Sequence, residues 1–566
     1  MHSITSLILL AFALTLPAAA LVTRQANAST ITSVTYAHGT VLGLTLGLTE
    51  TFKGIPFAEP PVGPLRLRPP VPISRNLGTF ASDPSPRACP QFSSQVDTKS
   101  LPAEVASLYK STPFGQVIAN AGEDCLTLSI QRPAGTRSSA KLPVVFWLYG
   151  GAFATGSTNS YDATSLLTRA KALKQPVLFV AANYRLGGFG FLPGAAVSRA
   201  GASNLGLRDQ RAALEWVQDN IASFGGDPDR VVIWGESAGA LSVFDHTVIN
   251  GGDHTRNGKA LFRGAIMNSG AVAPTQNVSH PKPQAVYDSV LRAAGCAKAV
   301  DGLECLRGLS YGAFVNAVDS VPAVFSYRSV DLAYLPRPDP ADGFYNVSPE
   351  VAIVEGRYAR VPIIVGDQQD EGTLFTLTLS NVTTTSKLEA YLASMFWDAT
   401  PAQIAALVKT YPRDPGAGSP YNTALTNEIY PGFKRVAAIL GDLTFTLSRR
   451  VYLAAVANNI PAWSYLSTYL YGTAVLGTFH GSDILELFYG GIPWPLPAAA
   501  METYYISFIN HLDPNAIRDG LIDWPRYTPE GRKLMNFQQA LSAVIKDDFR
   551  EDSYRQLAQS PQSFRL

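Results

Sequence analysis

A serine between a predicted strand and a predicted helix is the feature that most constrains the fold of this chain. The run VVIW (residues 231–234) is β-branched and aromatic, as in a buried strand, and AGALSVF (238–244) is typical of a helix. Between them lies GESAG (235–239), a match to G-x-S-x-G with Ser237 at its centre. Small residues two positions before and after the serine let strand and helix pass closely, while the serine sits in a strained, exposed turn. A turn with no catalytic role could have the same five-residue sequence, but the flanking strand and helix favour a nucleophilic serine.

Short apolar runs alternate with helical patterns along the rest of the chain. A helix is predicted over 207–224, the segments 384–460 and 490–560 are predicted to be mainly helical, and strands are predicted at 144–148, 177–182, 231–234, 263–268, 361–365 and 462–466. This alternation predicts an α/β fold with a large central, mostly parallel sheet flanked by helices. No repeat, low-complexity tract or charge block divides the 566 residues, so we expect a single domain over residues 21–566.

The N-terminus predicts secretion. Residues 4–22 are the only long apolar run, and Pro17 followed by three alanines resembles the cleavage region of a signal peptide. We therefore expect a signal peptide over residues 1–20, an extracellular protein and no transmembrane span after cleavage; an uncleaved membrane anchor is the alternative.

Composition excludes some partners and leaves others open. The 45 basic and 44 acidic residues give a net charge of +1 with no dominant basic patch, so nucleic acid is not an expected partner.

The four cysteines, Cys89, Cys125, Cys296 and Cys305, suggest two disulfides in a secreted chain, whereas four free thiols would suit an intracellular one. Three pairings are possible, of which Cys296–Cys305 is the local one. No Cys/His cluster has the spacing of a zinc site, so neither a metal nor another cofactor is expected.

Four sequons are candidates for N-glycosylation, and they carry no argument for secretion because chance gives about three in a chain of this length. They lie at Asn27, Asn277, Asn346 and Asn381.

A nucleophilic serine needs a base and a carboxylate that orients the base. Where the serine lies in a strand–turn–helix, the chain order is serine, acid, histidine. Of the seven histidines, only His480 and His511 lie well beyond the serine. We prefer His480, in a loop after the strand at 462–466, because His511 is predicted to lie at a helix end. The strand at 361–365 leads into Asp367, Asp370 and Glu371; the residues alone do not choose among these three, and a plain acidic turn is also possible.

The loop YGGAF (149–153) follows the predicted strand at 144–148, where an oxyanion loop belongs in such a fold. Its backbone N–H groups, with that of Ala238, could bind a developing oxyanion. Glycine-rich turns after strands are common, so this loop indicates an oxyanion site only in combination with the G-x-S-x-G turn.

Taken together, these motifs resemble the type-B carboxylesterase/lipase family, which includes the cholinesterases and fungal lipases of the Candida rugosa type. The matching blocks are FKGIPFAEPPVGPLRLRPP (52–70), EDCLTLSIQRP (123–133), NYRLGGFGFL (183–192), the segment 204–240, IIVGDQQDEGTLF (363–375) and GTFHGSD (477–483). The resemblance implies an α/β-hydrolase fold and ester hydrolysis through an acyl-enzyme on Ser237. It also implies Glu371 as the acid, His480 as the base, and disulfides Cys89–Cys125 and Cys296–Cys305.

Further roles are implied by the same resemblance. The oxyanion donors fall on Gly151, Ala152 and Ala238, and Ala152 departs from the family, which usually has a third glycine there. The added methyl group narrows the space beside the reacting carbonyl while the N–H is retained. Glu236, Ser269 and Asp483 match a polar cluster near the family's catalytic residues, although a purely structural role is equally open to them.

In the fungal lipases of this family the first disulfide loop is a lid, which here is Pro90–Asp124. Leu101, Val105, Leu108 and Tyr109 would form one apolar helical face, as they would in any amphipathic surface helix. We therefore expect a hydrolase of water-insoluble esters at a lipid–water interface, with triacylglycerols and sterol esters as candidates. A carboxylesterase for small soluble esters is the alternative enzyme. A non-catalytic adhesion relative is disfavoured because such proteins lose the serine. The sequence predicts no oligomeric state.

Overall fold

The computed structural model describes residues 30–92, 118–469, 472–488 and 496–566, together with positions 99, 103, 106, 107 and 110. The predicted signal peptide, the sequon at Asn27 and the predicted apolar face at positions 101, 105, 108 and 109 lie outside the described residues.

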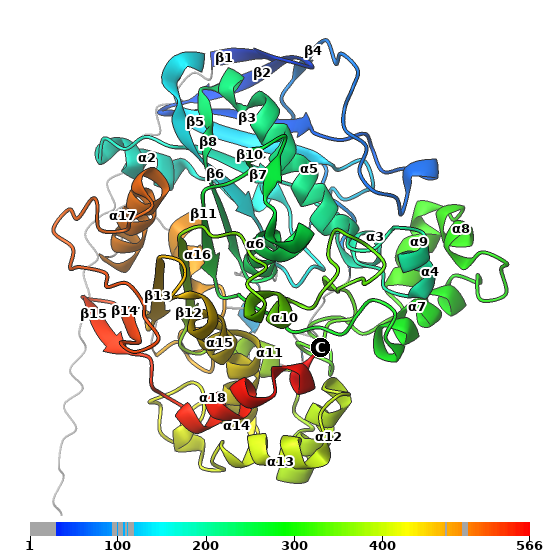
Figure 1. Ribbon diagram of the computed structural model, residues 1–566, viewed down its shortest axis with the longest axis vertical. Coiled ribbons are helices and arrows are strands. Elements are labelled where there is room, and N and C mark those ends of the chain that lie inside the picture. The colour runs from blue at the N-terminus through cyan, green and yellow to red at the C-terminus, as the bar shows by residue number, and fades with distance from the viewer. Residues whose placement is uncertain are drawn as a thin grey trace, which may run out of the picture.

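One large twisted sheet runs through the molecule (Figure 1). Its order is β1 (Thr30–Tyr36), β2 (Gly39–Leu46), β3 (Thr49–Pro56), β5 (Thr127–Pro133), β7 (Leu178–Ala182), β6 (Leu142–Leu148), β8 (Gly226–Glu236), β11 (Gly264–Asn268), β12 (Ile363–Gln368), β13 (Ala462–Ser467), β14 (Lys533–Phe537) and β15 (Ser542–Lys546), and β4 (Thr79–Ala81) pairs with β2. The strands from β7 to β14 are parallel, whereas the pairings from β1 to β7 and from β14 to β15 are antiparallel. The predicted parallel sheet is therefore the middle of a larger mixed sheet.

Every strand predicted from the sequence is present; the largest difference is at β8, which begins five residues before the strand predicted at 231–234. The prediction that 490–560 is mainly helical is wrong for its middle part. After α17 (Leu496–His511) the chain forms the antiparallel pair β14–β15, which extends the sheet, and only then α18 (Glu551–Gln559). In β15 the burial pattern contains no buried residue, so the strand lacks the apolar alternation by which it could be recognised.

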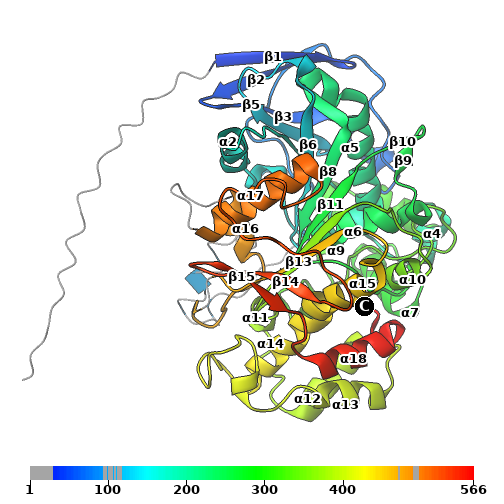
Figure 2. The same ribbon diagram turned by 60° about the vertical axis from the view of Figure 1, so that its left-hand side comes forward.

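Helices cover both faces of the sheet (Figure 2). On one side, α5 (Leu205–Asn220) and α6 (Ala238–Val248) pack on β8. On the other, α17 contacts α2 (Thr164–Ala172) and α16 (Ser482–Phe488), and it reaches β6 and β8. Because both faces are covered, β6 and β7 are buried almost throughout, which explains why their sequences read as continuous apolar runs.

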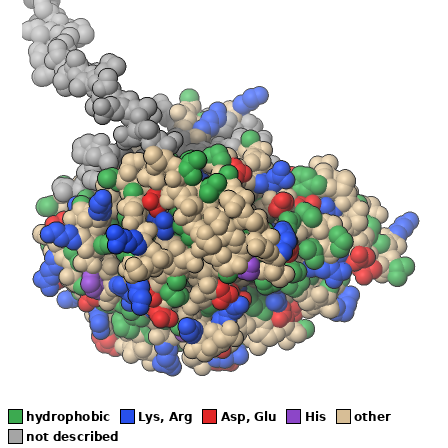
Figure 3. All heavy atoms as spheres, turned by 90° about the horizontal axis from the view of Figure 1, so that it is seen from above, with side chains coloured by type: hydrophobic (Ala, Val, Ile, Leu, Met, Phe, Trp, Pro, Cys, Tyr) green, Lys and Arg blue, Asp and Glu red, His purple; other side chains and the backbone are tan. Residues whose placement is uncertain are grey.

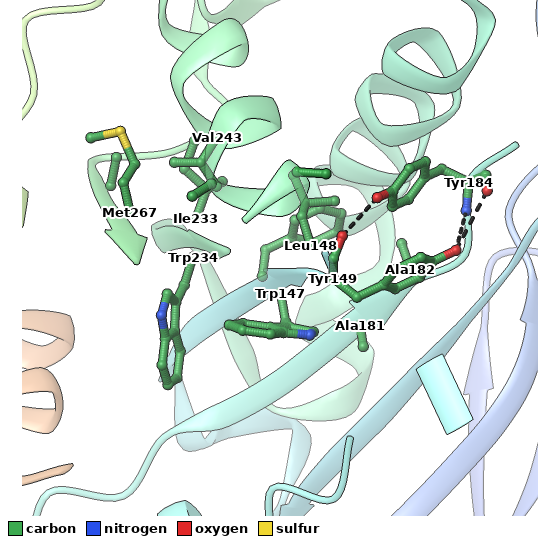
Figure 4. Close-up of a cluster of buried hydrophobic side chains, with 14 of the residues drawn as sticks. Trp147, Leu148, Tyr149, Ala181, Ala182, Tyr184, Ile233, Trp234, Val243 and Met267 are labelled. Atoms are coloured by element: carbon green, nitrogen blue, oxygen red, sulfur yellow. Dashed lines mark hydrogen bonds between the residues drawn. The ribbon is translucent and has the colours of Figure 1, made fainter. Parts of the chain in front are cut away.

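The core beside the glycine-rich loop is aromatic (Figure 4). Trp147 and Trp234, on the neighbouring strands β6 and β8, meet edge to face with ring centroids 5.0 Å apart. Tyr149 and Tyr184 stack at 4.6 Å, and the hydroxyl of Tyr184 donates a 2.6 Å hydrogen bond to the carbonyl oxygen of Tyr149. This contact fixes the backbone immediately before the loop that begins at Gly150.

A second hydrophobic cluster lies below the sheet in Figure 1. It is built by α11 (Thr373–Thr376), α12 (Thr385–Met395), α13 (Pro401–Lys409), α14 (Phe433–Gly441) and residues of the last 15 positions. Ala152, Leu332 and Leu566 pack against both clusters, so the glycine-rich loop lies where the two cores meet. That residues 21–566 form one domain stays a prediction.

The disulfides are Cys89–Cys125 and Cys296–Cys305, the pairing that the resemblance implies. In the part of the chain that the structure describes, no helix is both long and apolar enough to cross a membrane. On the face shown in Figure 3, basic and acidic side chains are interspersed with hydrophobic ones.

Candidate active site

Ser237 lies in the sharp turn between β8, which ends at Glu236, and α6, which begins at Ala238. Its backbone has φ 56° and ψ −126°, a sparsely populated conformation for a residue with a side chain. The turn is held because the N–H of Ser237 donates to the carbonyl oxygen of Asn268 (2.9 Å). A Cβ on Gly239 would lie 2.0 Å from the carbonyl oxygen of Leu148, so only glycine lets α6 pass β6 this closely.

Three side chains from distant parts of the sequence form a continuous chain of hydrogen bonds. His480 Nε2 lies 2.8 Å from Ser237 Oγ, and His480 Nδ1 lies 2.5 Å from an oxygen of Glu371. His480 and Glu371 are buried, and Ser237 keeps 6% exposure. The other carboxylate oxygen of Glu371 accepts a 2.7 Å bond from the N–H of Gln368. The structure thus brings together the serine, acid and histidine that the sequence analysis named.

The other two carboxylates of the acidic loop have different partners. Asp367 pairs with Arg449 at 2.7 Å, and both side chains are fully buried. Asp370 accepts hydrogen bonds from the Ser419 hydroxyl and the N–H groups of Tyr421 and Thr478, each 2.9 Å long. Of the three carboxylates, only Glu371 contacts the histidine.

Asp370 also aligns the loop that carries His480. Besides accepting from the N–H of Thr478, it donates its own N–H to the carbonyl oxygen of Thr478 (2.8 Å), and it forms an isolated parallel bridge with Phe479. These contacts join the end of β12 to the loop that carries the histidine. Asp370 lies one residue before Glu371, and Thr478 lies two residues before His480.

The alternative base, His511, is the last residue of α17 and is exposed. Its Nε2 lies 3.1 Å from the side-chain oxygen of Gln175, and it takes no part in the site.

The glycine-rich loop after β6 turns tightly beside Ser237. Gly151, Ala152 and Phe153 have φ values of 109°, 58° and 55°, and the N–H groups of Ala154 and Thr155 both donate to the carbonyl oxygen of Gly151. The left-handed conformation costs a residue such as Ala152 about 1 kcal/mol or more relative to glycine. No described residue accepts a hydrogen bond from the N–H groups of Gly151, Ala152 or Ala238. Three donors near the serine are therefore available to a ligand oxygen.

Buried polar groups surround this arrangement. Glu236 Oε1 lies 3.5 Å from His480 Nε2, and burial, with the nearby Asp483 and Glu371, raises the pKa of Glu236 well above its usual value. Burial raises the pKa of Asp483 to about 6 even though its carboxylate accepts from Asn268 Nδ2 at 2.7 Å. Ser269 has φ 53°, and its buried hydroxyl has no hydrogen-bond partner among the described residues.

Sequence reasoning missed two aromatic residues that hold the imidazole. Phe375 and Phe445 lie against His480, with ring centroids 5.0 and 4.5 Å away. Phe445 belongs to the π-helix η9 (Asp442–Thr446), which is inserted between α14 and α15 (Leu447–Val456). Single π-helical turns often occur at functional sites. The sequence of this helical segment carries no signal for the extra residue.

Comparison with known proteins places this geometry in a family. A sequence model of the Carboxylesterase family matches residues 29–556. The secreted triacylglycerol lipase LIP1 of Gibberella zeae is 52% identical over 93% of this chain and 90% of its own length. Secreted lipase 1 of Botryotinia fuckeliana is 50% identical over 95% and 94%. The crystal structure of Aspergillus niger EstA superposes with a TM-score of 0.78 at 25% identity, covering 94% of this chain and 99% of that one.

The chain belongs to the carboxylesterase family, has the α/β-hydrolase fold and is a carboxylic ester hydrolase. The predicted resemblance and the predicted extracellular location are both confirmed.

Proposed function

We propose that this chain hydrolyses water-insoluble esters of long-chain fatty acids, with triacylglycerols as the main substrate class. Two relatives that cover most of its length are named as lipases, one of them as a triacylglycerol lipase. Sterol esters are the second lipid class to be tested.

In the proposed reaction, Ser237 Oγ attacks the ester carbonyl carbon while His480 Nε2 takes the hydroxyl proton. Glu371, 2.5 Å from Nδ1, holds the ring so that Nε2 faces the serine, and its charge stabilises the imidazolium that forms. His480 then gives this proton to the leaving alcohol as the carbon–oxygen bond breaks, which leaves the acyl group on Ser237. Water attacks the acyl-enzyme in the same way and releases the fatty acid.

The negative charge in both tetrahedral intermediates lies on the former carbonyl oxygen. We assign its stabilisation to the N–H groups of Gly151, Ala152 and Ala238, because these donors have no protein acceptor among the described residues. Loss of one such donor typically costs about 10²–10³ in rate.

An apolar cavity supports the choice of a long acyl chain. It is lined mainly by hydrophobic side chains from segments 272–274, 395–396, 443–451 and 557–566. None of the catalytic side chains lines this cavity; Val272 follows Ser269 by three residues in the sequence, and Leu443 precedes Phe445 by two on the same helical segment. A fatty acyl chain bound here would leave water at a gain of about 25 cal/mol per Å² of apolar area.

The test compares initial rates on a short soluble ester, tributyrin, triolein and cholesteryl oleate. We expect the greatest activity on the glycerides and a Leu443→Trp variant that loses triolein hydrolysis while keeping the short ester. Val354→Trp, on a side chain that is 79% exposed, is the size-matched control. A preference for the short soluble ester, unchanged in Leu443→Trp, would instead favour the small-ester carboxylesterase.

We also propose, from the sequence resemblance, that Pro90–Asp124 is a lid. The Cys89–Cys125 disulfide closes this segment, whose apolar positions lie outside the described residues. The activity should then rise sharply once a partly soluble ester exceeds its solubility, because a lipid surface favours an open form. Leu101→Ser with Leu108→Ser should flatten that rise and spare the short ester; identical curves for the two proteins would remove the gating role.

A further inference from the structure

We propose that Asn277 carries an N-linked glycan whose first sugars lie in a polar hollow and bind segment 561–566 to the body of the protein. Asn277-Val278-Ser279 is a sequon in a chain that passes through the secretory pathway, where such asparagines are modified. The proposal is independent of the substrate.

The local structure presents the Asn277 side chain to solvent. Val278, the middle residue of the sequon, is buried; its N–H donates to the carbonyl oxygen of Pro338 (2.8 Å), and its own carbonyl accepts from Gly194 (2.9 Å). Asn277 is exposed, and its side-chain oxygen accepts from the N–H and hydroxyl of Ser279 at 3.1 and 3.2 Å. No described residue accepts a hydrogen bond from the Asn277 side-chain nitrogen, the atom that would carry the sugar.

A hollow of about 390 Å³ has Asn277 in its lining. Because a water molecule occupies about 30 Å³ in the liquid, the hollow is large enough for sugar rings as well as water. Its lining is polar and offers both donors and acceptors: Gln276, Asn277, His280, Asp398, Gln562, Ser563 and Arg565. Hydroxyl-rich rings suit such a lining better than an apolar ligand does.

An exposed aromatic ring lies next to the hollow. Trp397 is 53% exposed, its indole N–H donates to the carbonyl oxygen of Ser394 (3.2 Å), and its ring centroid lies 6.3 Å from that of His280. The electron-rich face of an indole attracts the polarised C–H groups of a sugar ring. Trp397 therefore provides a stacking surface within reach of a glycan on Asn277.

The hollow and the apolar cavity are lined by different residues of the same three segments, 272–280, 395–398 and 557–566. Hydrogen bonds already join these segments: the N–H of Gln276 donates to the carbonyl oxygen of Leu566 (3.1 Å), and the N–H of Leu566 donates to that of Pro274 (3.0 Å). Gln276 Nε2 also donates to Asp398 (3.3 Å). A glycan that touches all three segments would add to these contacts and stabilise the segments that line the cavity.

The test uses the secreted protein from a eukaryotic host. Glycopeptide mass spectrometry should find Asn277 occupied, and Ser279→Ala and Asn277→Gln should each remove that glycan and lower Tm by about 2 °C. Asn381→Gln, which removes another exposed sequon, is the matched control and should leave Tm within error.

A second measurement separates the bound glycan from a merely attached one. Trp397→Ala should keep Asn277 occupied but make its glycan several-fold faster to release by an endoglycosidase acting on the folded protein. An unmodified Asn277 would overturn the proposal. So would release rates at Asn277 that are equal in wild type and Trp397→Ala, or equal Tm losses for Asn277→Gln and Asn381→Gln.

Discussion

Asp367, Asp370 and Glu371 lie within five consecutive positions, yet each contacts a different part of the molecule. Asp367 meets Arg449 from α15, Asp370 binds two loops, and Glu371 faces His480. The residues alone could not separate them because all of these partners come from far along the chain. Only the family resemblance selected Glu371, which is the carboxylate that lies against His480 in the structure.

The first prediction concerns these carboxylates. Glu371→Gln should lower kcat by about 10⁴, because the neutral amide no longer stabilises the imidazolium or fixes its tautomer. Asp370→Asn should lower kcat less and leave KM unchanged, because the amide NH₂ cannot accept the bonds that hold the histidine loop. Asp367→Asn should mainly reduce stability, since it leaves Arg449 in a buried place with one partner fewer.

Hydrolysis of a soluble ester, measured with thermal unfolding of each variant, checks this order. If Asp370→Asn lost more activity than Glu371→Gln at equal stability, the assignment of the acid would be wrong.

At the scale of elements, local sequence signals were sufficient for the serine turn and its surroundings. The residues that force the turn, such as Gly239, are adjacent to the strand and helix that they join, so β8 and α6 could both be predicted. Two elements could not be predicted from local sequence signals. The β14–β15 hairpin takes its conformation from pairing with β13, and the π-helix η9 places Phe445 against His480, a residue 35 positions later. Both depend on tertiary contacts that leave no local pattern.

The second prediction tests the close approach of α6 to β6. Gly239→Ala places a methyl group against the Leu148 carbonyl, so the helix must shift and carry Ser237 away from His480. We expect a stability loss of about 1–3 kcal/mol and a fall in kcat of at least tenfold. Gly312→Ala in α9 (Tyr311–Val318), where a Cβ meets nothing within 4 Å, should instead be neutral or slightly stabilising. Denaturant unfolding and ester hydrolysis measure both; full activity in Gly239→Ala would contradict the packing argument.

At the scale of the whole molecule, the net charge is +1, and several of the acidic residues counted in it are buried carboxyl groups. Burial raises the pKa of Asp245 to about 8, that of Glu502 to about 7 and that of Asp483 to about 6. Each group holds its proton in the folded protein at a pH where the unfolded chain has lost it. The folded state therefore binds more protons between pH of about 4 and 8, and these groups make the free energy of unfolding fall as pH rises through that window.

One buried carboxylate acts in the opposite sense. Burial alone would raise the pKa of Asp547, but Arg449 and Arg450 lower it to about 2. Its contribution to stability is present above the unfolded pKa of about 4 and is lost as pH falls toward 2. Together, the two kinds of group place the greatest stability in mildly acidic solution.

The last prediction isolates the largest of these effects. Asp245, in α6, accepts a 3.0 Å hydrogen bond from the Tyr345 hydroxyl, and an asparagine oxygen can accept the same bond without ever ionising. Asp245→Asn should be more stable than wild type by only about 1–2 kcal/mol near pH 5, about one pH unit above the unfolded pKa of the carboxyl, and the difference should grow to several kcal/mol near pH 8. Asp253→Asn, on a nearby carboxyl that is fully exposed, should give no such gain. Thermal midpoints at pH 5, 6, 7 and 8 compare the three proteins; curves for wild type and Asp245→Asn that stay parallel would show that Asp245 is ionised throughout, with its charge balanced in the folded state.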